Sequence, residues 1–359
     1  MKKALALVVV LAIALLSAAT CEISNNIRES PALIGISMPR QTSVRWTKDG
    51  DIMTDILTGR GYNVDLQFAE NDVPTQKQQV EAMLAKGAKV LVIAAVDSSA
   101  LSSILDRAAE DGVSVISYDR LLVDTAAVSY YATFDNFGVG VLQAQSLIDG
   151  LREKKGPGPY NIELFAGSPD DTNSGFFFKG AESVLRSLID SGEVTVVSGL
   201  TTQEQVGIIR WDGAIAETRM DAILDAYYSA GKPLHGVLSP SDGISRGIIS
   251  AFYSFGFEPG NDNWPVVTGQ DAEAESIKMI TTGEQYSTVF KDTRELARMT
   301  ADMVEAVLED RAPVINDTTT YNNNVKIVPS YLLVPYIVHA DNYKQLIIGS
   351  GYLTEDDIR

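Results

Sequence analysis

Residues 90–118 of this chain read VLVIAAVDSSALSSILDRAAEDGVSVISY, and this stretch decides the fold class. Its ends, Val90–Ala95 and Val113–Tyr118, are apolar runs of strand length, while Leu101–Glu110 between them has helical period. Gly112 stands where such a helix must end before the next strand begins. Two strands joined through a helix form the repeating unit of a parallel sheet, because parallel strands need a crossover connection.

The same alternation continues on both sides of this stretch. Upstream we predict strands at Leu33–Met38 and Val64–Phe68 and helices at Arg45–Arg60 and Val73–Lys86, the second one capped by Asp72. The pattern then restarts with strands at Ile162–Phe165, Val194–Ser198, Gly236–Ser239, Val266–Thr268 and Thr288–Phe290. Helices are predicted at Ser174–Asp190, Gly213–Tyr228, Ile244–Phe255, Ala272–Thr281 and Arg294–Asp310, followed by an extended segment at Lys326–Val334. Two consecutive α/β units predict two lobes, each a doubly wound parallel sheet.

Length and composition limit the class of protein further. A chain of 359 residues favours two domains, because single cores stop growing at roughly 250–300 residues. The net charge of −18 argues against binding nucleic acid or an anionic membrane face, both of which need clustered Lys and Arg. One cysteine excludes an internal disulfide and makes a cysteine-ligated zinc site implausible.

The first 21 residues have the pattern of an export signal. Lys2 and Lys3 precede an apolar run from residue 4 to 16, and small residues then lead to Cys21. Two outcomes are open: acylation of the Cys21 thiol, which gives a lipid-anchored protein, or cleavage after Ala19, which gives a free one. In either case the signal peptide falls within residues 1–21, and the localisation is periplasmic or cell-surface.

Polar side chains gather after the predicted strands, where ligands of open parallel sheets bind. They include Arg45-Trp46, Asp119-Arg120, Asp135-Asn136, Asp170 to Asn173, Arg210-Trp211-Asp212, Ser241-Asp242, Asp271 and Lys291-Asp292. A sugar hydroxyl both donates and accepts hydrogen bonds, so carboxylates beside arginine, lysine and asparagine suit a neutral polyol. Trp46 and Trp211 can cover the C–H faces of a pyranose ring.

Several longer runs carry a specific resemblance. They are Tyr118-Asp119-Arg120-Leu121, Tyr130 to Asn136 (YYATFDN), Gly167 to Asp171 (GSPDD), Gly269 to Glu273 (GQDAE) and Tyr286 to Leu296 (YSTVFKDTREL). From about Leu33 to its C-terminus the chain resembles the multiple-sugar-binding periplasmic receptors and, more distantly, the xylose- and galactose/glucose-binding proteins of sugar ABC transporters.

This resemblance implies a type I periplasmic-binding-protein-like α/β fold, in which three hinge strands join two lobes that clasp a sugar. It assigns 32–135 plus about 293–325 to the N-terminal lobe, and 136–292 plus about 326–359 to the C-terminal lobe. It implies no catalytic residue, metal or cofactor. The ligand-binding residues that it implies are Arg45, Trp46, Asp119, Arg120, Asp171, Asn173, Trp211, Ser241, Asp242, Asp271 and Lys291.

The expected function is capture of a monosaccharide, an aldose such as glucose, galactose, arabinose or xylose, for delivery to an ABC permease. A chemoreceptor or sensor kinase is a further partner, and a sensing role without transport is an alternative. A glycosidase is a second alternative, because Asp171, Asp242 and Asp271 could pair as acid and base. A sugar-responsive repressor would need a DNA-binding segment where this chain has its apolar signal.

Overall fold

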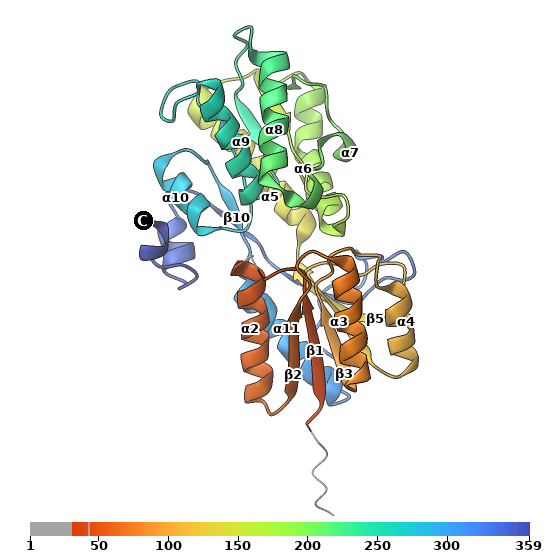
Figure 1. Ribbon diagram of the computed structural model, residues 1–359. Coiled ribbons are helices and arrows are strands. Elements are labelled where there is room, and N and C mark those ends of the chain that lie inside the picture. The colour runs from red at the N-terminus through yellow and green to blue at the C-terminus, as the bar shows by residue number, and fades with distance from the viewer. Residues whose placement is uncertain (1–30, 42–43) are drawn as a thin grey trace, which may run out of the picture. The chain divides into compact units, whose positions relative to one another are not determined.

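The computed structural model describes residues 31–41 and 44–359. The predicted signal peptide at 1–21, with Cys21, lies outside the described residues. Leu33–Arg359 form one compact unit, and within this unit the helices and strands are divided between two lobes (Figure 1). Along 31–41 and 44–359 no helix is both long and apolar enough to span a membrane.

The first lobe is built on a six-stranded sheet in the order β11-β5-β4-β3-β1-β2, with every neighbouring pair parallel. The strands are β1 (Leu33–Met38), β2 (Asn63–Phe68), β3 (Ala88–Ile93), β4 (Ser114–Tyr118), β5 (Val128–Phe134) and β11 (Ser330–Leu333). Its helices are α2 (Val44–Gly59), α3 (Val73–Ala85), α4 (Ser102–Glu110) and α11 (Thr293–Leu308).

Side chains that alternate along each strand bury both faces of this sheet. Val90 and Val92 pack with α2 and α11, whereas Leu91 and Ile93 pack with α3 and α4. Successive strand residues point to opposite faces, so the continuous apolar run of β3 is what a sheet covered on both sides requires. Asp72 caps α3 as predicted, accepting from the backbone N–H of Thr75.

The second lobe repeats this arrangement on a smaller parallel sheet in the order β7-β6-β8-β9. Helices α5 and α6 cover one face, and α8 and α9 cover the other. The strands are β6 (Tyr160–Leu164), β7 (Val194–Val196), β8 (Gly236–Leu238) and β9 (Val266–Val267). The helices are α5 (Asn136–Lys155), α6 (Thr172–Asp190), α7 (Gln203–Val206), η1 (Ile209–Trp211), α8 (Gly213–Ile223), η2 (Leu224–Tyr228), α9 (Asp242–Phe255) and α10 (Ala274–Thr282).

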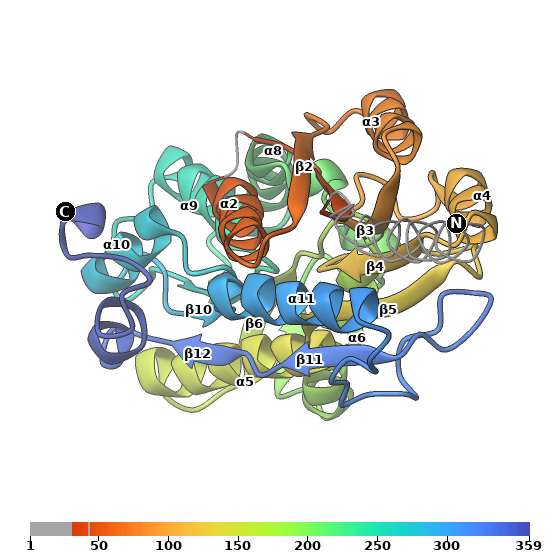
Figure 2. The same ribbon diagram turned by 90° about the horizontal axis from the view of Figure 1, so that it is seen from below.

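The chain crosses between the lobes three times. The crossings lie between β5 and α5, between β10 (Thr288–Phe290) and α11, and between β11 and β12 (Tyr336–Val338). β10 and β12 pair antiparallel, and β11 and β12 run nearly in line (Figure 2). The C-terminal segment with η3 (Lys344–Ile348) and η4 (Asp356–Ile358) packs beside α10. The predicted α/β fold with two parallel-sheet lobes and three hinge strands is confirmed.

Many of the predicted bounds differ from the structure by one or a few residues, and two differences have a clear structural cause. The last crossing was expected at about residue 326, but β11 pairs with β5 in the first sheet, so the chain leaves the first lobe after Leu333. The helix predicted from Ala272 begins at Ala274, because Asp271 and Ala272 have φ of 98° and 51°, in the left-handed region that excludes a right-handed helix. Both differences arise from tertiary contacts that local sequence patterns do not encode.

Candidate ligand-binding site

Seven of the predicted side chains come together where the two lobes meet. Arg45 stands in the first turn of α2, and Asp119 and Arg120 directly follow β4. From the second lobe, Asp171 and Asn173 lie at the start of α6, Asp271 follows β9, and Lys291 follows β10. We call these seven residues the inter-lobe cluster: Arg45, Asp119, Arg120, Asp171, Asn173, Asp271 and Lys291.

Arg45 connects the carboxylates of both lobes. It forms an ion pair with Asp119, and its Nη1 lies 3.8 Å from Oδ1 of Asp271. Its Nε lies 3.8 Å from Oδ2 of Asp49, one helical turn further along α2. Burial disfavours the charged guanidinium, yet Asp119, Asp271 and Asp49 together hold the pKa of Arg45 above its ordinary value. Arg45 therefore stays a cation between three acidic groups.

The backbone carbonyl of Asp119 is a second point where the lobes join. It accepts hydrogen bonds from the Tyr131 hydroxyl at 2.6 Å, from Thr133 Oγ1 at 3.1 Å and from Asn173 Nδ2 at 2.7 Å. Asn173 Oδ1 in turn accepts from Asn136 Nδ2 at 2.9 Å and lies 2.9 Å from the Tyr131 hydroxyl, whose one proton is shared between Asn173 and the Asp119 carbonyl. The amide of Asn173 thus contacts Asp119 and Tyr131 of the first lobe as well as Asn136 of its own lobe.

Arg120 and Asp171 form the other charged contact between the lobes. Nε of Arg120 lies 3.1 Å from Oδ2 of Asp171, and its Nη1 donates to the Ala95 carbonyl at 2.9 Å. Asp171 also caps α6, accepting from the Asn173 N–H at 3.0 Å. Burial raises the pKa of Asp171 while Arg120 opposes that rise. The pKa of Asp119 is lowered because Arg45, Lys291 and Arg120 together outweigh its burial.

Lys291 and Asp271 complete the cluster beside the hinge. Lys291 Nζ lies 3.0 Å from Oδ1 of Asp271, and it sits 5.7 and 5.6 Å from the ring centroids of Phe134 and Phe177. The Lys291 side chain is buried while that of Asp271 is 22% exposed. The cluster as a whole sets three cations against three carboxylates, so its charge is balanced and its polar atoms point across the junction.

The two predicted aromatic platforms differ in their surroundings. Trp46 is 5% exposed and packs in the first-lobe core, with the Arg45 guanidinium 4.4 Å and that of Arg120 5.6 Å from its ring centroid. Its ring therefore supports the two arginines in this structure. Trp211 lies edge-on to Phe177, and its buried indole N–H has no hydrogen-bond partner among the described residues.

Ser241 and Asp242 lie deeper in the second lobe than the cluster. Ser241 caps α9, accepting from the Ile244 N–H at 3.5 Å. Asp242 is 0% exposed, and both of its carboxylate oxygens already accept hydrogen bonds from protein donors. The structure places neither side chain among the ion pairs of the cluster, unlike the six predicted charged residues that belong to it.

Asp49 was not found by the sequence reasoning. Its side chain is 0% exposed beneath Arg45, and burial raises its pKa to about 7 although Arg45 opposes the rise. The spacing of four residues between Arg45 and Asp49 places them on one face of a helix. That spacing was visible in the sequence, but it is also typical of exposed surface pairs, so it did not predict a buried partner of the site.

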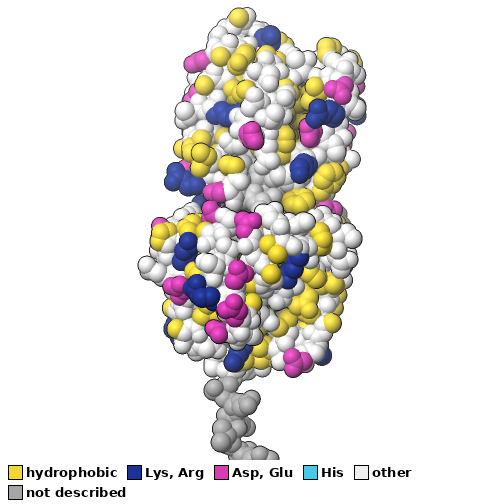
Figure 3. All heavy atoms as spheres, turned by 90° about the vertical axis from the view of Figure 1, so that its right-hand side faces the viewer, with side chains coloured by type: hydrophobic (Ala, Val, Ile, Leu, Met, Phe, Trp, Pro, Cys, Tyr) yellow, Lys and Arg dark blue, Asp and Glu magenta, His cyan; other side chains and the backbone are white. Residues whose placement is uncertain are grey.

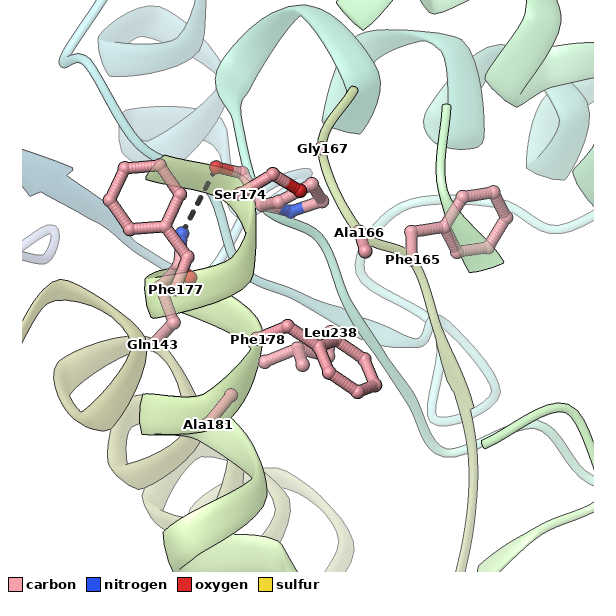
Figure 4. Close-up of a pocket in the computed structure, with 10 residues that line it drawn as sticks. Gln143, Phe165, Ala166, Gly167, Ser174, Phe177, Phe178, Ala181 and Leu238 are labelled. Atoms are coloured by element: carbon pink, nitrogen blue, oxygen red, sulfur yellow. Dashed lines mark hydrogen bonds between the residues drawn. The ribbon is translucent and has the colours of Figure 1, made fainter. Parts of the chain in front are cut away.

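Two hollows in the second lobe lie outside the inter-lobe cluster. One is a void of about 10 Å³ between α5, α6 and the ends of β6 and β8, lined by Phe165, Gly167, Phe177 and Leu238 (Figure 4). This volume is about what one water molecule requires. The other, of about 390 Å³, lies along α6 and has Lys179, Glu182 and Arg186 at its rim. Neither is lined by a residue of the inter-lobe cluster.

Within the part of the chain that the structure describes, no three His, Cys, Asp or Glu side chains are placed to share a metal ion. On the face that Figure 3 shows, Lys and Arg are scattered among acidic and hydrophobic side chains instead of forming a basic patch.

Comparison with known proteins gives consistent similarities. A family model described as periplasmic binding protein domain matches residues 34–312. The multiple sugar-binding periplasmic receptor ChvE of Rhizobium radiobacter is 51% identical over 326 residues, 91% of this chain and 92% of that protein. The multiple sugar-binding periplasmic protein SbpA of Azospirillum brasilense is 53% identical over 322 residues, 90% of each chain.

A solved structure matches over the same range. It is an ABC transporter solute binding protein from Clostridium phytofermentans with bound β-D-glucose, with a TM-score of 0.86 and 42% identity, covering 91% of this chain and 100% of that one. The resemblance that the sequence indicated is confirmed by these comparisons.

Proposed function

Since this chain belongs to the family of periplasmic binding proteins, we propose that it is an exported solute-binding protein that captures a monosaccharide between its lobes. The observation that carries this proposal is the inter-lobe cluster, in which both lobes supply charged hydrogen-bonding groups to one place. The ligand class is a neutral aldose such as glucose, galactose, arabinose or xylose. ChvE and SbpA, which the chain resembles over nine tenths of its length, are multiple sugar-binding proteins by name.

The chemistry of the cluster suits a polyol. Each sugar hydroxyl can donate to a carboxylate and accept from a cation, and Asp271 with Lys291 offers both within 3.0 Å. Hydrogen bonds to charged groups contribute roughly 1.5–3 kcal/mol each. Several such hydrogen bonds give a net binding free energy of about −8 kcal/mol once the cost of immobilising the ligand is subtracted, which corresponds to a micromolar dissociation constant. The indole of Trp211 is proposed to cover one face of the ring.

The mechanism follows from contacts that exist only when the lobes meet. Arg45 with Asp271 and Arg120 with Asp171 join opposite lobes, and three crossings connect these lobes. A ligand that touches both lobes binds the closed form more tightly than the open one, so it shifts the population toward closure. We propose that an ABC permease recognises this closed form, and that a chemoreceptor or sensor kinase is a second partner.

The carboxylates favour binding over catalysis. A glycosidase needs one protonated carboxylic acid and one free carboxylate across a glycosidic bond. Here Asp119, Asp171 and Asp271 each lie in an ion pair with an arginine or a lysine, so each is placed beside a hydrogen-bond donor in an arrangement that suits ligand binding. We therefore propose that the protein carries out no reaction on its ligand. Periplasmic localisation follows the relatives, and lipid anchoring through Cys21 is proposed as one of two forms.

A binding experiment that also inspects the ligand tests this function. The chain without residues 1–21 is titrated with D-glucose, D-galactose, L-arabinose and D-xylose by calorimetry, and each sugar is recovered and examined by NMR. At least one aldose should bind with micromolar or lower dissociation constant and be recovered unchanged. Absence of binding by every aldose would refute the proposal, and release of a modified sugar would favour the enzyme alternative.

A further inference from the structure

We propose that Asp242 is a positioning residue, which holds the loop 270–273 so that the Asp271 carboxylate faces the ligand, while Asp242 itself does not touch the ligand. This inference rests on the proposed function, because it assigns a role within the same site. The sequence resemblance placed Asp242 among the ligand contacts, but the structure buries it completely behind the loop that carries Asp271.

Asp242 forms hydrogen bonds to the loop on both sides of Asp271. Its backbone N–H donates to the carbonyl of Gln270 at 2.9 Å, on the residue before Asp271. Its Oδ2 accepts from the backbone N–H of Glu273 at 2.9 Å, two residues after Asp271. Asp271 is therefore held between two anchor points that both belong to one residue of α9.

The other carboxylate oxygen of Asp242 is connected to the loop indirectly, through the Thr288 hydroxyl. Oδ1 accepts from Thr288 Oγ1 at 2.8 Å and from Gln285 Nε2 at 2.9 Å. The same Thr288 hydroxyl accepts from the backbone N–H of Ala272 at 3.2 Å. The carboxylate and the hydroxyl thus restrain the two residues that follow Asp271, and they tie the loop to β10, the strand that leads to Lys291.

The loop needs such restraint because its backbone is unusual. Asp271 and Ala272 have φ of 98° and 51°, a region that residues with side chains rarely adopt unless surrounding contacts hold them there. Gly269 allows these contacts, because a Cβ at that position would lie 2.2 Å from Oδ1 of Asp242 and 2.3 Å from Nε2 of Gln285. The chain approaches the carboxylate closely where a side chain is absent.

The consequence of the restrained loop is the direction of one carboxylate. Oδ1 of Asp271 lies 3.0 Å from Lys291 Nζ and 3.8 Å from Arg45 Nη1 of the other lobe. Asp242 has no ion pair in the cluster, since its oxygens are occupied by Glu273, Gln285 and Thr288. We therefore expect its effect on ligand affinity to pass through Asp271, and this makes the role testable.

A double-mutant cycle tests whether the effect passes through Asp271. Asp242→Asn keeps the shape of the side chain but turns an amide toward donors, so the dissociation constant for D-glucose should rise at least tenfold. In the Asp271→Ala background the same substitution should change it less than twofold, since residues that act as a unit are not additive. Equal changes in both backgrounds would overturn the proposal.

A buried carboxyl remote from the cluster gives the matched control. Glu163 is 1% exposed in β6 and accepts from Ser198 N at 3.1 Å and the Tyr228 hydroxyl at 2.8 Å. Glu163→Gln should lower the melting temperature as Asp242→Asn does, yet leave the D-glucose dissociation constant within twofold. A comparable loss of affinity in Glu163→Gln would show that destabilisation alone weakens binding, and would overturn the assignment.

Two further measurements keep the proposal testable if Asp242→Asn does not fold or if D-glucose does not bind. Thr288→Val should weaken D-glucose binding as Asp242→Asn does, whereas Thr288→Ser, which keeps the hydroxyl, should bind like wild type. Equal affinities of the two Thr288 variants would overturn the proposal. Without ligand, amide hydrogen exchange at Ala272 and Glu273 should accelerate at least tenfold in Thr288→Val and not in Thr288→Ser. Unchanged exchange overturns the positioning role, whereas failure of wild type to bind any aldose overturns only the proposed function.

Discussion

Replacement of Gly167 by alanine is the sharpest test of the proposed aromatic platform. Gly167 follows β6, and a Cβ there would lie 2.0, 2.2 and 2.5 Å from Cη2, Cζ2 and Cζ3 of Trp211. Carbon atoms in contact rest about 3.5–4.0 Å apart, so the indole must withdraw by roughly 1.5 Å or rotate away. Gly167 does not have a positive φ, so alanine strains the side-chain packing and not the backbone.

The expected magnitude follows from the displaced ring. Overpacking of a filled site costs about 1–3 kcal/mol, and part of this is relieved because Trp211 is only half-buried. We therefore expect a modest loss of stability and a larger loss of ligand affinity. Misplacement of the indole should raise the dissociation constant at least tenfold, which corresponds to about 1.4 kcal/mol.

Calorimetric titration with D-glucose and a thermal melt measure the two effects separately. Gly243→Ala is the matched control, because a Cβ there meets only Nη2 of Arg246 at 3.8 Å and the residue lies in the same lobe, near the start of α9. The control should bind like wild type. If Gly167→Ala binds D-glucose as tightly as Gly243→Ala, then Trp211 is not the platform and the proposed site must be redrawn.

Three other predictions concern the same site and its surroundings. Trp211→Ala should raise the dissociation constant for D-glucose at least tenfold. Trp264→Phe, which loses a hydrogen bond to the Glu284 carbonyl in the second-lobe core, should lower only the melting temperature. If calorimetry shows a larger loss of affinity in Trp264→Phe than in Trp211→Ala, the assignment is contradicted. Asp171→Asn keeps a good helix cap but leaves Arg120 without its carboxylate. The affinity for D-glucose should therefore fall at least tenfold while stability changes little. An unaltered dissociation constant would count against a role of the inter-lobe ion pair in binding. Burial raises the pKa of Asp49 from 3.8 to about 7, so the folded state binds its proton more tightly than the unfolded state, and the resulting stabilisation is complete below about pH 4 and is lost as pH rises through 7. In urea titrations, Asp49→Asn should therefore show a smaller decline in the free energy of unfolding over this pH range than wild type. Parallel pH curves for the two proteins would disprove the shift.

Local patterns in the sequence determined the secondary structure and its order. Alternation of apolar runs with helical periods predicted the parallel sheets, because buried strands and amphipathic helices each have their own hydrophobic period. The strands Leu33–Met38 and Thr288–Phe290 were predicted with the bounds that the structure gives them. The rule that ligands meet the carboxyl ends of parallel strands also directed attention to the residues that form the inter-lobe cluster, since it depends on topology alone.

Tertiary structure decided which of these polar residues face one another. Asp242 and Asp271 look alike in sequence, each following a strand, yet one is fully buried behind its loop and the other reaches Arg45 across the junction. The same holds for Asp49, which lies under Arg45, and for β11, which joins the first sheet although it lies in the segment from about residue 326 that was expected in the second lobe. Burial and the partner of a charge depend on chain segments distant in sequence, and no local period records them.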